Sequence, residues 1–260
     1  MRETHTPLLE ISRLSQRFGG LQALTNFNFS LDEYELVGLI GPNGAGKTTV
    51  FNLVSGFYLP TEGLISFAGK PTRGMMPYQI TSLGLARTFQ NIRLWNDMSV
   101  LDNMRIAQYH RLGYGFWDAV LRTRRYATAE KRIDTKCREV LNIMDLLEFA
   151  EEKPKNLPYG LQRRVELARA LSTDPRLLLL DEPAAGLNAL DVDELICLIR
   201  WIYEEFKITI WMIEHQMKVV MALCQKITVL DFGKIIARGT PSEIQNNGDV
   251  IKAYLGDSAI

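Results

Sequence analysis

The chain has 260 residues, 47% of them hydrophobic, and its 30 basic residues balance 30 acidic ones. This length allows one large domain or two small ones with a substantial core. The charge balance argues against nucleic acid as the main partner, because nucleic-acid binding usually leaves a basic excess. A local basic cluster is more typical of a solvated helix face than of a binding patch. It consists of Arg122, Arg124, Arg125, Lys131 and Arg132.

The cysteines and the apolar runs indicate a cytoplasmic, soluble chain. Cys137, Cys197 and Cys224 form no CxxC motif, so we expect reduced thiols that pack as small apolar side chains. The polar start, MRETHTPLLE, does not resemble a signal peptide. The longest apolar runs, such as LLLL at 177–180, are much shorter than the ~20 residues of a spanning helix. Any membrane role is therefore expected to come through a partner.

In chain order, the first predicted elements are short strands. They lie at Leu8–Ile11, Asn28–Leu31, Leu36–Ile40 and Leu64–Phe67. From about residue 99 to 150 the sequence becomes helical and charged. The order of elements predicts an α/β fold with a helical insertion at about residues 90–160.

The C-terminal third favours a parallel sheet. The continuous apolar runs RLLLLDEP (176–183) and KITIWMIEH (207–215) are typical of strands buried on both faces. Between them, apolar residues repeat every three or four positions over Asp191–Phe206, which predicts an amphipathic helix. The DFG at 231–233 lacks the rest of the kinase motif set, and Gly233 there predicts a hairpin turn.

The segment GPNGAGKTT, at 41–49, matches the phosphate-loop pattern G-x-x-x-x-G-K-[ST] between an apolar strand and a helix. Its glycines allow backbone N–H groups to point at phosphate oxygens, and the helix N-terminus adds positive potential. Lys47 is expected to reach the β- and γ-phosphates, and Thr48 to bind Mg²⁺. The predicted ATP-binding residues are Gly41, Pro42, Asn43, Gly44, Ala45, Gly46, Lys47, Thr48 and Thr49.

A pair of carboxylates follows the strand LLLL. Asp181 ends a buried strand, where a carboxylate is costly unless it serves a cation, so it is predicted to be a Mg²⁺ ligand. Glu182 is expected to polarise the water that attacks the γ-phosphate. The alternative is a solvated pair that ends the strand.

A third stretch, LPYGLQRRVELARAL at 157–171, has no nucleophile, metal ligand or acid/base pair. It predicts a turn at Gly160 followed by a helix with an apolar side, while its charged residues face elsewhere. On its own chain this glycine turn has no evident chemistry.

Together these segments resemble the ATP-binding subunits of ABC transporters. The resemblance covers nearly the whole chain and rests on GPNGAGKTT, ARTFQNIRLW, LPYGLQRRVELARAL, LLLLDEPAAGLN and MIEHQM, in the family's order. A closer resemblance is to the ATPases of importers for branched-chain and other hydrophobic amino acids. It rests on the segments RTFQNIRLW, DEPAAGLN and the tail GTPSEIQNNGDVIKAYLG.

The resemblance implies an ABC ATPase core with a mixed sheet, an antiparallel β subdomain and a helical insertion. A single ABC ATPase domain would span residues 1–260, with the core and β subdomain at about 1–90 and 160–260. The helical subdomain would take about 91–160.

The resemblance also implies roles for residues outside the phosphate loop. Phe18 would stack on adenine, Gln90 would sense Mg²⁺ and the attacking water, and His215 would contact the γ-phosphate. The catalytic group would then be Glu182, His215, Gln90 and Lys47, and the metal group Thr48, Gln90 and Asp181. The alternative for Phe18 is an aromatic residue of the core. The alternative for a lone histidine such as His215 is a structural role.

In this family two ATPase subunits pack head to tail, with ATP between the phosphate loop of one and the signature turn of the other. The signature residues that would face the partner's ATP are Pro158, Tyr159, Gly160 and Leu161. The usual serine is replaced by Pro158, which lacks a hydroxyl. In the loop expected to cross to the partner, at 186–188, the family's aspartate two residues after the leucine is replaced by Ala189.

The expected function is therefore ATP hydrolysis that drives an importer, with ATP and Mg²⁺ as cofactors and no nucleic-acid partner. The expected partners are a second ATPase, identical or not, two membrane permeases and, indirectly, a solute-binding protein. The chain would sit peripherally on the cytoplasmic face of the membrane. Importers of urea or short amides, exporters, non-transport ABC proteins and phosphotransferases are the alternatives. Leu94 or Trp95 is expected to line a groove for a permease helix, unless this segment packs internally.

Overall fold

The computed structural model describes residues 6–255 and divides the chain into two compact units. One unit holds the described residues up to Arg87 together with those from Arg176 on, and the other spans Thr88–Pro175. The second unit continues past the boundary predicted at about residue 160, because the helix Tyr159–Ser172 packs against the other helices of that unit.

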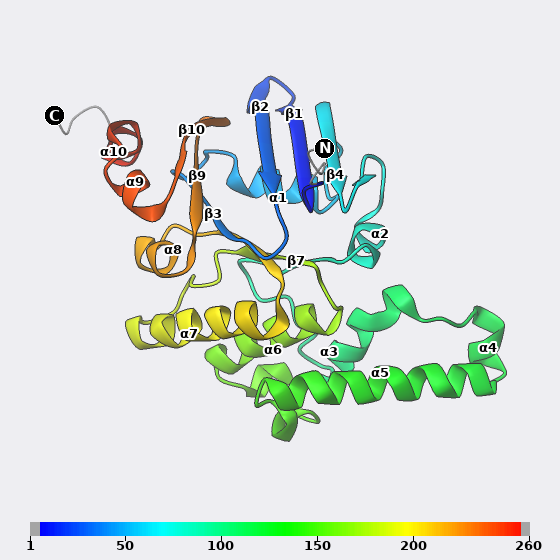
Figure 1. Cartoon of the computed structure of the whole chain (residues 1–260). Coiled ribbons are helices and arrows are strands. Elements are labelled where there is room, and N and C mark those ends of the chain that lie inside the picture. The colour runs from blue at the N-terminus through cyan, green and yellow to red at the C-terminus, as the bar shows by residue number, and fades with distance from the viewer. Residues whose placement is uncertain (1–5, 256–260) are drawn as a thin grey trace, which may run out of the picture. The chain divides into compact units, whose positions relative to one another are not determined.

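The first unit contains a six-stranded mixed sheet in the order β10-β9-β3-β8-β7-β6 (Figure 1). Neighbouring strands are parallel from β9 to β6, and only β10 is antiparallel to β9. The strands are β3 (Leu36–Ile40), β6 (Leu85–Arg87), β7 (Leu177–Asp181), β8 (Thr209–Ile213), β9 (Lys226–Asp231) and β10 (Lys234–Gly239). Every residue of β3, β7 and β8 is buried, as the continuous apolar runs predict.

A second, antiparallel sheet has the order β2-β1-β4-β5. Its strands are β1 (Leu9–Phe18), β2 (Leu21–Leu31), β4 (Glu62–Phe67) and β5 (Lys70–Pro71). β1 and β2 extend well beyond the short segments predicted from the sequence. They form one long hairpin whose register shifts between Ile11 and Arg17, and such bulges break the strict alternation on which strand prediction depends.

The core of the first unit lies between the two sheets, around α1 (Lys47–Val54). Trp211 of β8 stacks on Phe29 of β2, with ring centroids 4.3 Å apart, and meets Phe51 of α1 edge-on at 5.1 Å. This aromatic cluster joins both sheets to α1 and fixes the helix that follows the phosphate loop.

The remaining helices of the first unit are short, apart from α7. They are α2 (Pro77–Ser82), α7 (Ala189–Phe206), α8 (Met217–Leu223), α9 (Pro241–Gln245) and α10 (Gly248–Leu255). α7 buries the stripe that the three-and-four repeat predicts, and Gly233 lies in the tight turn between β9 and β10. The predicted mixed sheet, antiparallel sheet and helical insertion are confirmed.

The second unit is helical. It contains α3 (Val100–Ala107), α4 (Phe116–Val120), α5 (Arg124–Ile143) and α6 (Tyr159–Ser172), with 3₁₀ turns at Gln108–Arg111, Leu147–Phe149 and Pro154–Asn156. α3, α5 and α6 pack on one another (Figure 1). Arg163 and Glu166 of α6 are buried as an ion pair, 2.8 Å apart, which corrects the expectation that these charges face away from the apolar side.

Cys137 and Cys224 are buried free thiols, and burial raises the pKa of Cys137 to about 11. Cys197 is exposed, contrary to the expectation that all three thiols pack inside. None of the described helices is both long and apolar enough to cross a membrane.

Candidate active site

The phosphate loop connects β3 to α1 at the carboxyl edge of the parallel sheet. Gly41 and Gly46 both have positive φ, 151° and 104°. A Cβ atom on Gly41 would lie 2.0 Å from the Leu230 carbonyl oxygen, and one on Gly46 would lie 2.8 Å from that of Ala23. These two positions therefore need glycine for both conformation and space.

The Lys47 ammonium lies within this loop. Its Nζ donates to the carbonyl oxygens of Gly41, at 2.8 Å, and Pro42, at 2.9 Å. Burial lowers the pKa of Lys47, and the negative charges of Glu182 and Asp181 partly oppose that shift. The loop thus holds one cation beside two carboxylates, at the N-terminus of a helix.

A cavity of about 360 Å³ lies against the outer side of the loop. Phe18 lines it, 42% exposed, with its ring 5.3 Å from Tyr58 in an edge-on contact. The structure therefore brings Phe18, the phosphate loop and Glu182 to one cavity, as the sequence predicts. The full lining is Phe18, Leu21, Gln22, Ala23, Asn43, Gly44, Gly46, Lys47, Thr48, Thr49, Glu182 and Phe232.

Asp181 ends β7, next to β8, and its side chain is 6% exposed. Its Oδ2 accepts a hydrogen bond from the Arg87 guanidinium at 2.7 Å, and Arg87 also donates to Asn52 Oδ1 of α1 at 2.8 Å. Arg87, at the end of β6, thus ties the carboxylate to the helix of the phosphate loop. Sequence reasoning missed this arginine because the pair is separated by 94 residues.

Glu182 adopts a left-handed conformation, with φ of 48°, directly after the strand. Such a conformation is costly for a residue other than glycine, and it is often retained where a side chain must be aimed. His215 lies two residues after β8, and its Nδ1 is 3.7 Å from Glu182 Oε2. The neighbouring carboxyl ends of β7 and β8 therefore bring Glu182, the predicted base, and His215 together.

Glu214 is a second residue that sequence reasoning missed. Its side chain is 0% exposed. One carboxylate oxygen accepts from the backbone N–H of Ala184 at 2.8 Å, and the other from those of His215 at 2.8 Å and Gln216 at 2.9 Å. Glu214 therefore joins the loop after Glu182 to the segment that carries His215.

The oxygen donors at this site fit Mg²⁺. This ion favours carboxylate and hydroxyl oxygens and keeps several waters and phosphate oxygens of its own, so a site with one or two protein ligands suffices. Asp181 and Thr48 provide such donors. No group of three or more His, Cys, Asp or Glu side chains that could hold a metal ion occurs among residues 6–255.

Comparisons with known proteins agree with this geometry. The family model described as ABC transporter matches residues 24–185. The chain is 44% identical to the high-affinity branched-chain amino acid transport ATP-binding protein BraF of Pseudomonas aeruginosa and 45% identical to LivG of Escherichia coli strain K12. Each match covers 97% of this chain and 99% of the relative.

The chain belongs to the ABC transporter ATP-binding family. It is accordingly an ATPase. Two solved cassettes of ABC transporters, one nucleotide-free and one in the ADP conformation of MJ1267, superpose on this ABC ATPase with a TM-score of 0.83 each. They are 27% and 26% identical to it, and each match covers 97% of this chain and 100% of the other. A second family model, for branched-chain amino acid ATP-binding cassette transporters, matches residues 234–260.

The remaining predicted site residues of this ABC ATPase belong to the second unit. The Gln90 carbonyl accepts from the Arg163 guanidinium, and Phe89 does the same at 2.9 Å. The first residue of α6 is Tyr159, with Pro158 in the capping position. Gly160 lies in the first helical turn, which corrects the predicted chain-breaking turn there, and a Cβ atom on it would meet nothing within 4 Å.

The two residues predicted to meet a permease, Leu94 and Trp95, differ in exposure. Leu94 is half-buried, whereas Trp95 is 49% exposed, and the Arg169 guanidinium lies 5.5 Å from the centre of the Trp95 ring. The Trp95 backbone is held by Asn103, which accepts from its N–H at 2.8 Å and donates to its carbonyl oxygen. The permease contact of Leu94 or Trp95 stays a prediction.

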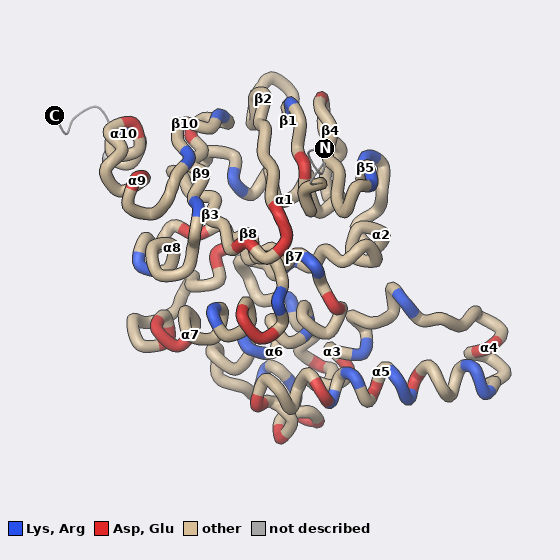
Figure 2. Tube along the Cα trace, viewed as in Figure 1, with Lys and Arg blue, Asp and Glu red and all other residues tan. Residues whose placement is uncertain are grey.

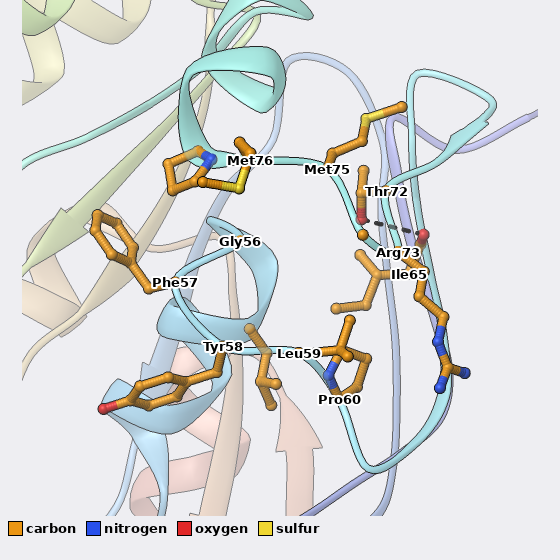
Figure 3. Close-up of a pocket in the computed structure, with 13 residues that line it drawn as sticks. Gly56, Phe57, Tyr58, Leu59, Pro60, Ile65, Thr72, Arg73, Met75 and Met76 are labelled. Atoms are coloured by element: carbon orange, nitrogen blue, oxygen red, sulfur yellow. Dashed lines mark hydrogen bonds between the residues drawn. The ribbon is translucent and has the colours of Figure 1, made fainter.

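A second cavity of the first unit, of about 450 Å³, lies beside the end of α1 (Figure 3). The side chains of Phe57, Leu59 and Met76 border it, and the Thr72 hydroxyl donates to the Ile65 carbonyl oxygen at 3.3 Å. Its lining includes no carboxylate and no histidine. This cavity therefore offers apolar contact rather than chemistry.

Proposed function

We propose that this ABC ATPase is the motor subunit of an importer for branched-chain or other hydrophobic amino acids. The observation that carries the proposal is its near-full-length similarity to two proteins named for branched-chain amino acid transport. The match of residues 234–260 to a family model for the same class of transporter supports it independently of the ATPase motifs.

The geometry of the first unit supports assigned roles in ATP hydrolysis. Lys47 and the N-terminus of α1 attract the phosphates, and Phe18 stacks on adenine at the mouth of the same cavity. Glu182 accepts a proton from the attacking water. His215, near Glu182, contacts the γ-phosphate.

The metal site of the proposal consists of Thr48 and Asp181 of the first unit. When bound, Mg²⁺ supplies charge neutralisation at the phosphates. Arg87 holds Asp181 by a short hydrogen bond, so the carboxylate has a fixed orientation before nucleotide arrives.

The proposal includes a second ATPase subunit packed head to tail. Pro158–Leu161 then face ATP held by the partner's phosphate loop. The open space around Gly160 supports this role, because a backbone can be approached closely there. ATP binding closes the dimer, hydrolysis reopens it, and the motion reaches two permeases at the cytoplasmic face of the membrane. A solute-binding protein delivers the amino acid.

Transport by the assembled complex in liposomes tests this function. We expect ATP-dependent uptake of labelled leucine, isoleucine or valine, abolished by Lys47→Ala in this chain, with Lys252→Ala on α10 as the matched control. Uptake of urea or a short amide in place of amino acids would overturn the solute class. ATP hydrolysis without uptake of any of these solutes would overturn the role in import.

A further inference from the structure

One segment of the second unit has large apolar side chains that its own fold does not use. Residues 113–132 include α4 and the first turns of α5, and not one of these twenty residues is buried. The buried residues of α5 begin at Ile133. The segment therefore extends beyond the packed core of its unit, at the α4 end of α5 (Figure 1).

Four apolar side chains are exposed on this segment, and we call them the α4 patch. Phe116 is 74% exposed, Trp117 71%, Val120 56% and Leu121 71%. Because they stand at positions i, i+1, i+4 and i+5, they share one side of a helical turn. Scattered exposed apolar residues are ordinary, but four adjacent ones mark a contact surface.

The segment is held in shape by polar contacts that leave the patch free. Asp118 accepts from the Gly115 N–H at 3.1 Å and from the Thr123 hydroxyl at 2.8 Å. The Tyr114 hydroxyl donates to Glu130 at 2.6 Å. Both carboxylates of residues 113–132 are therefore engaged within the segment.

The charge around the patch is positive. Residues 113–132 contain five basic and two acidic residues, a net charge of 5 − 2 = +3, in a chain whose net charge is zero. Among the described residues, Arg122, Arg124 and Lys131 form no ion pair with a carboxylate, and all three are exposed. Figure 2 shows basic residues at the start of α5, beside α4.

We infer that the α4 patch is a contact site for a membrane surface that contains anionic lipids. An aromatic and aliphatic face flanked by cations matches the boundary between lipid headgroups and acyl chains. The patch projects from a short helix, whereas a groove would suit a partner helix. The inference rests on the proposed place of the chain at a membrane.

Vesicle binding by the full chain, with neither permeases nor nucleotide, tests the inference separately from transport. We expect binding to vesicles of phosphatidylglycerol and phosphatidylethanolamine, little binding to phosphatidylcholine vesicles, and weakening by salt. The double variant Phe116→Ser/Trp117→Ser should bind about tenfold more weakly. Replacing Arg122 and Arg124 by Gln should also weaken binding to the anionic vesicles about tenfold.

Matched variants test whether the effect belongs to the α4 patch. Tyr78→Ser removes an exposed aromatic from α2, and Arg13→Gln/Lys70→Gln removes two exposed charges from the first unit; both should bind as the unchanged chain does. Brominated lipids should quench the fluorescence of Trp117. The Trp117→Phe variant should therefore lose this quenching, whereas the Trp95→Phe variant should keep it. Circular dichroism and ATP affinity verify folding of each variant.

Several results would overturn the inference. The inference fails if the full chain does not bind anionic vesicles, if it binds neutral vesicles equally well, or if the patch variants bind as strongly as the control variants. In the assembled transporter in membranes, a photo-crosslinker at position 117 should react with lipid. A crosslink only to a permease would replace the lipid with a protein partner and reject the inference.

Discussion

The phosphate-loop cavity of the first unit and the signature turn of the second unit are built in opposite ways. At the phosphate-loop site, the charged groups already have partners. Lys47 donates to two carbonyl oxygens, Asp181 accepts a hydrogen bond from Arg87, and Glu182 lies near His215. At the start of α6, by contrast, Pro158, Tyr159 and Gly160 are exposed, and Pro158 provides no side-chain hydrogen bond to the helix.

This difference indicates a division of labour between the two regions. A site that performs chemistry requires preorganised charges, which are fixed by hydrogen bonds and burial. A surface that completes another subunit's site requires accessible backbone donors at a helix N-terminus. The first region should therefore respond to substitution within this chain, and the second only when a partner is present.

The largest effect is expected at Glu182. Glu182→Gln keeps the shape of the side chain but removes the proton acceptor, so turnover in the complex should fall ~10²-fold or more, while ATP still binds. Phosphate release and nucleotide binding measure the two properties, and the dimer should accumulate closed with ATP. Glu205→Gln, an exposed change on α7, should leave turnover unaltered. Near-normal turnover of Glu182→Gln would reject the role of the base.

The next largest effect is expected for Arg87, on the free energy of unfolding. Arg87→Gln leaves Asp181 buried without its cation, and breaking a buried ion pair costs about 3–5 kcal/mol. Urea unfolding of the isolated chain measures the loss. Arg176→Gln is the matched control, because it removes the partner of Glu33 in an ion pair that is about half exposed, where the cost is about 0–1 kcal/mol. Equal losses in the two variants would contradict the importance of the buried pair.

The sequence predicts the motifs of the site better than the contacts that hold them. GPNGAGKTT, with a strand before it and a helix after it, predicts the loop because its conformation is set locally by glycines and by the start of α1. Arg87 and Glu214 could not be found in this way. Each acts through a partner distant in the chain, and only the strand order, with β8 beside β7 and β7 beside β6, brings those partners within hydrogen-bond distance.

The same reasoning explains the errors in the helical unit. Arg163 and Glu166 resemble a solvated charge pattern in sequence, but they neutralise each other in the interior and Arg163 donates to the backbone of Phe89 and Gln90. The sequence predicts a chain-breaking turn at Gly160, yet Pro158 before it already provides the extended N-cap residue from which α6 starts. Interior contacts therefore override the solvated charge pattern of Arg163 and Glu166, whereas at Gly160 the nearby Pro158 sets where the helix begins.

Glu214→Gln should have a smaller effect than Arg87→Gln. A glutamine keeps one acceptor oxygen and turns an NH₂ group toward backbone donors, so at least one hydrogen bond to a charged group is lost, at about 1.5–3 kcal/mol. Because Glu214 joins the two loops after β7 and β8, hydrolysis should also fall. Thermal unfolding and turnover measured together test this. Unchanged stability would show that the three N–H groups find other acceptors. Glu204→Gln, on the exposed side of α7, is the control.

The smallest effect is expected at Pro158, and only in a complex with a non-identical partner. Pro158 stands at the N-cap of α6 and lacks the hydroxyl that the family's usual serine donates to the γ-phosphate. A hydrogen bond to a charged group is worth ~1.5–3 kcal/mol, part of which water or another donor recovers. Pro158→Ser should therefore raise ATP affinity about tenfold at the site that uses the partner's phosphate loop. ATP affinity at the site of Lys47 should not change.

Measuring the two sites separately makes this prediction decisive. Each phosphate loop is disabled in turn by substituting its lysine, and ATP binding is followed at the remaining site, both in the unchanged complex and in the complex that carries Pro158→Ser. The isolated chain is the control, because without a partner the signature turn faces no nucleotide and Pro158→Ser should leave its ATP affinity unchanged. If affinity at the partner's loop does not rise, backbone donors and the dipole of α6 already hold the γ-phosphate fully. The exposed start of α6 would then be as complete in its role as the phosphate-loop cavity is, and the two ATP sites would differ in affinity for reasons outside this turn.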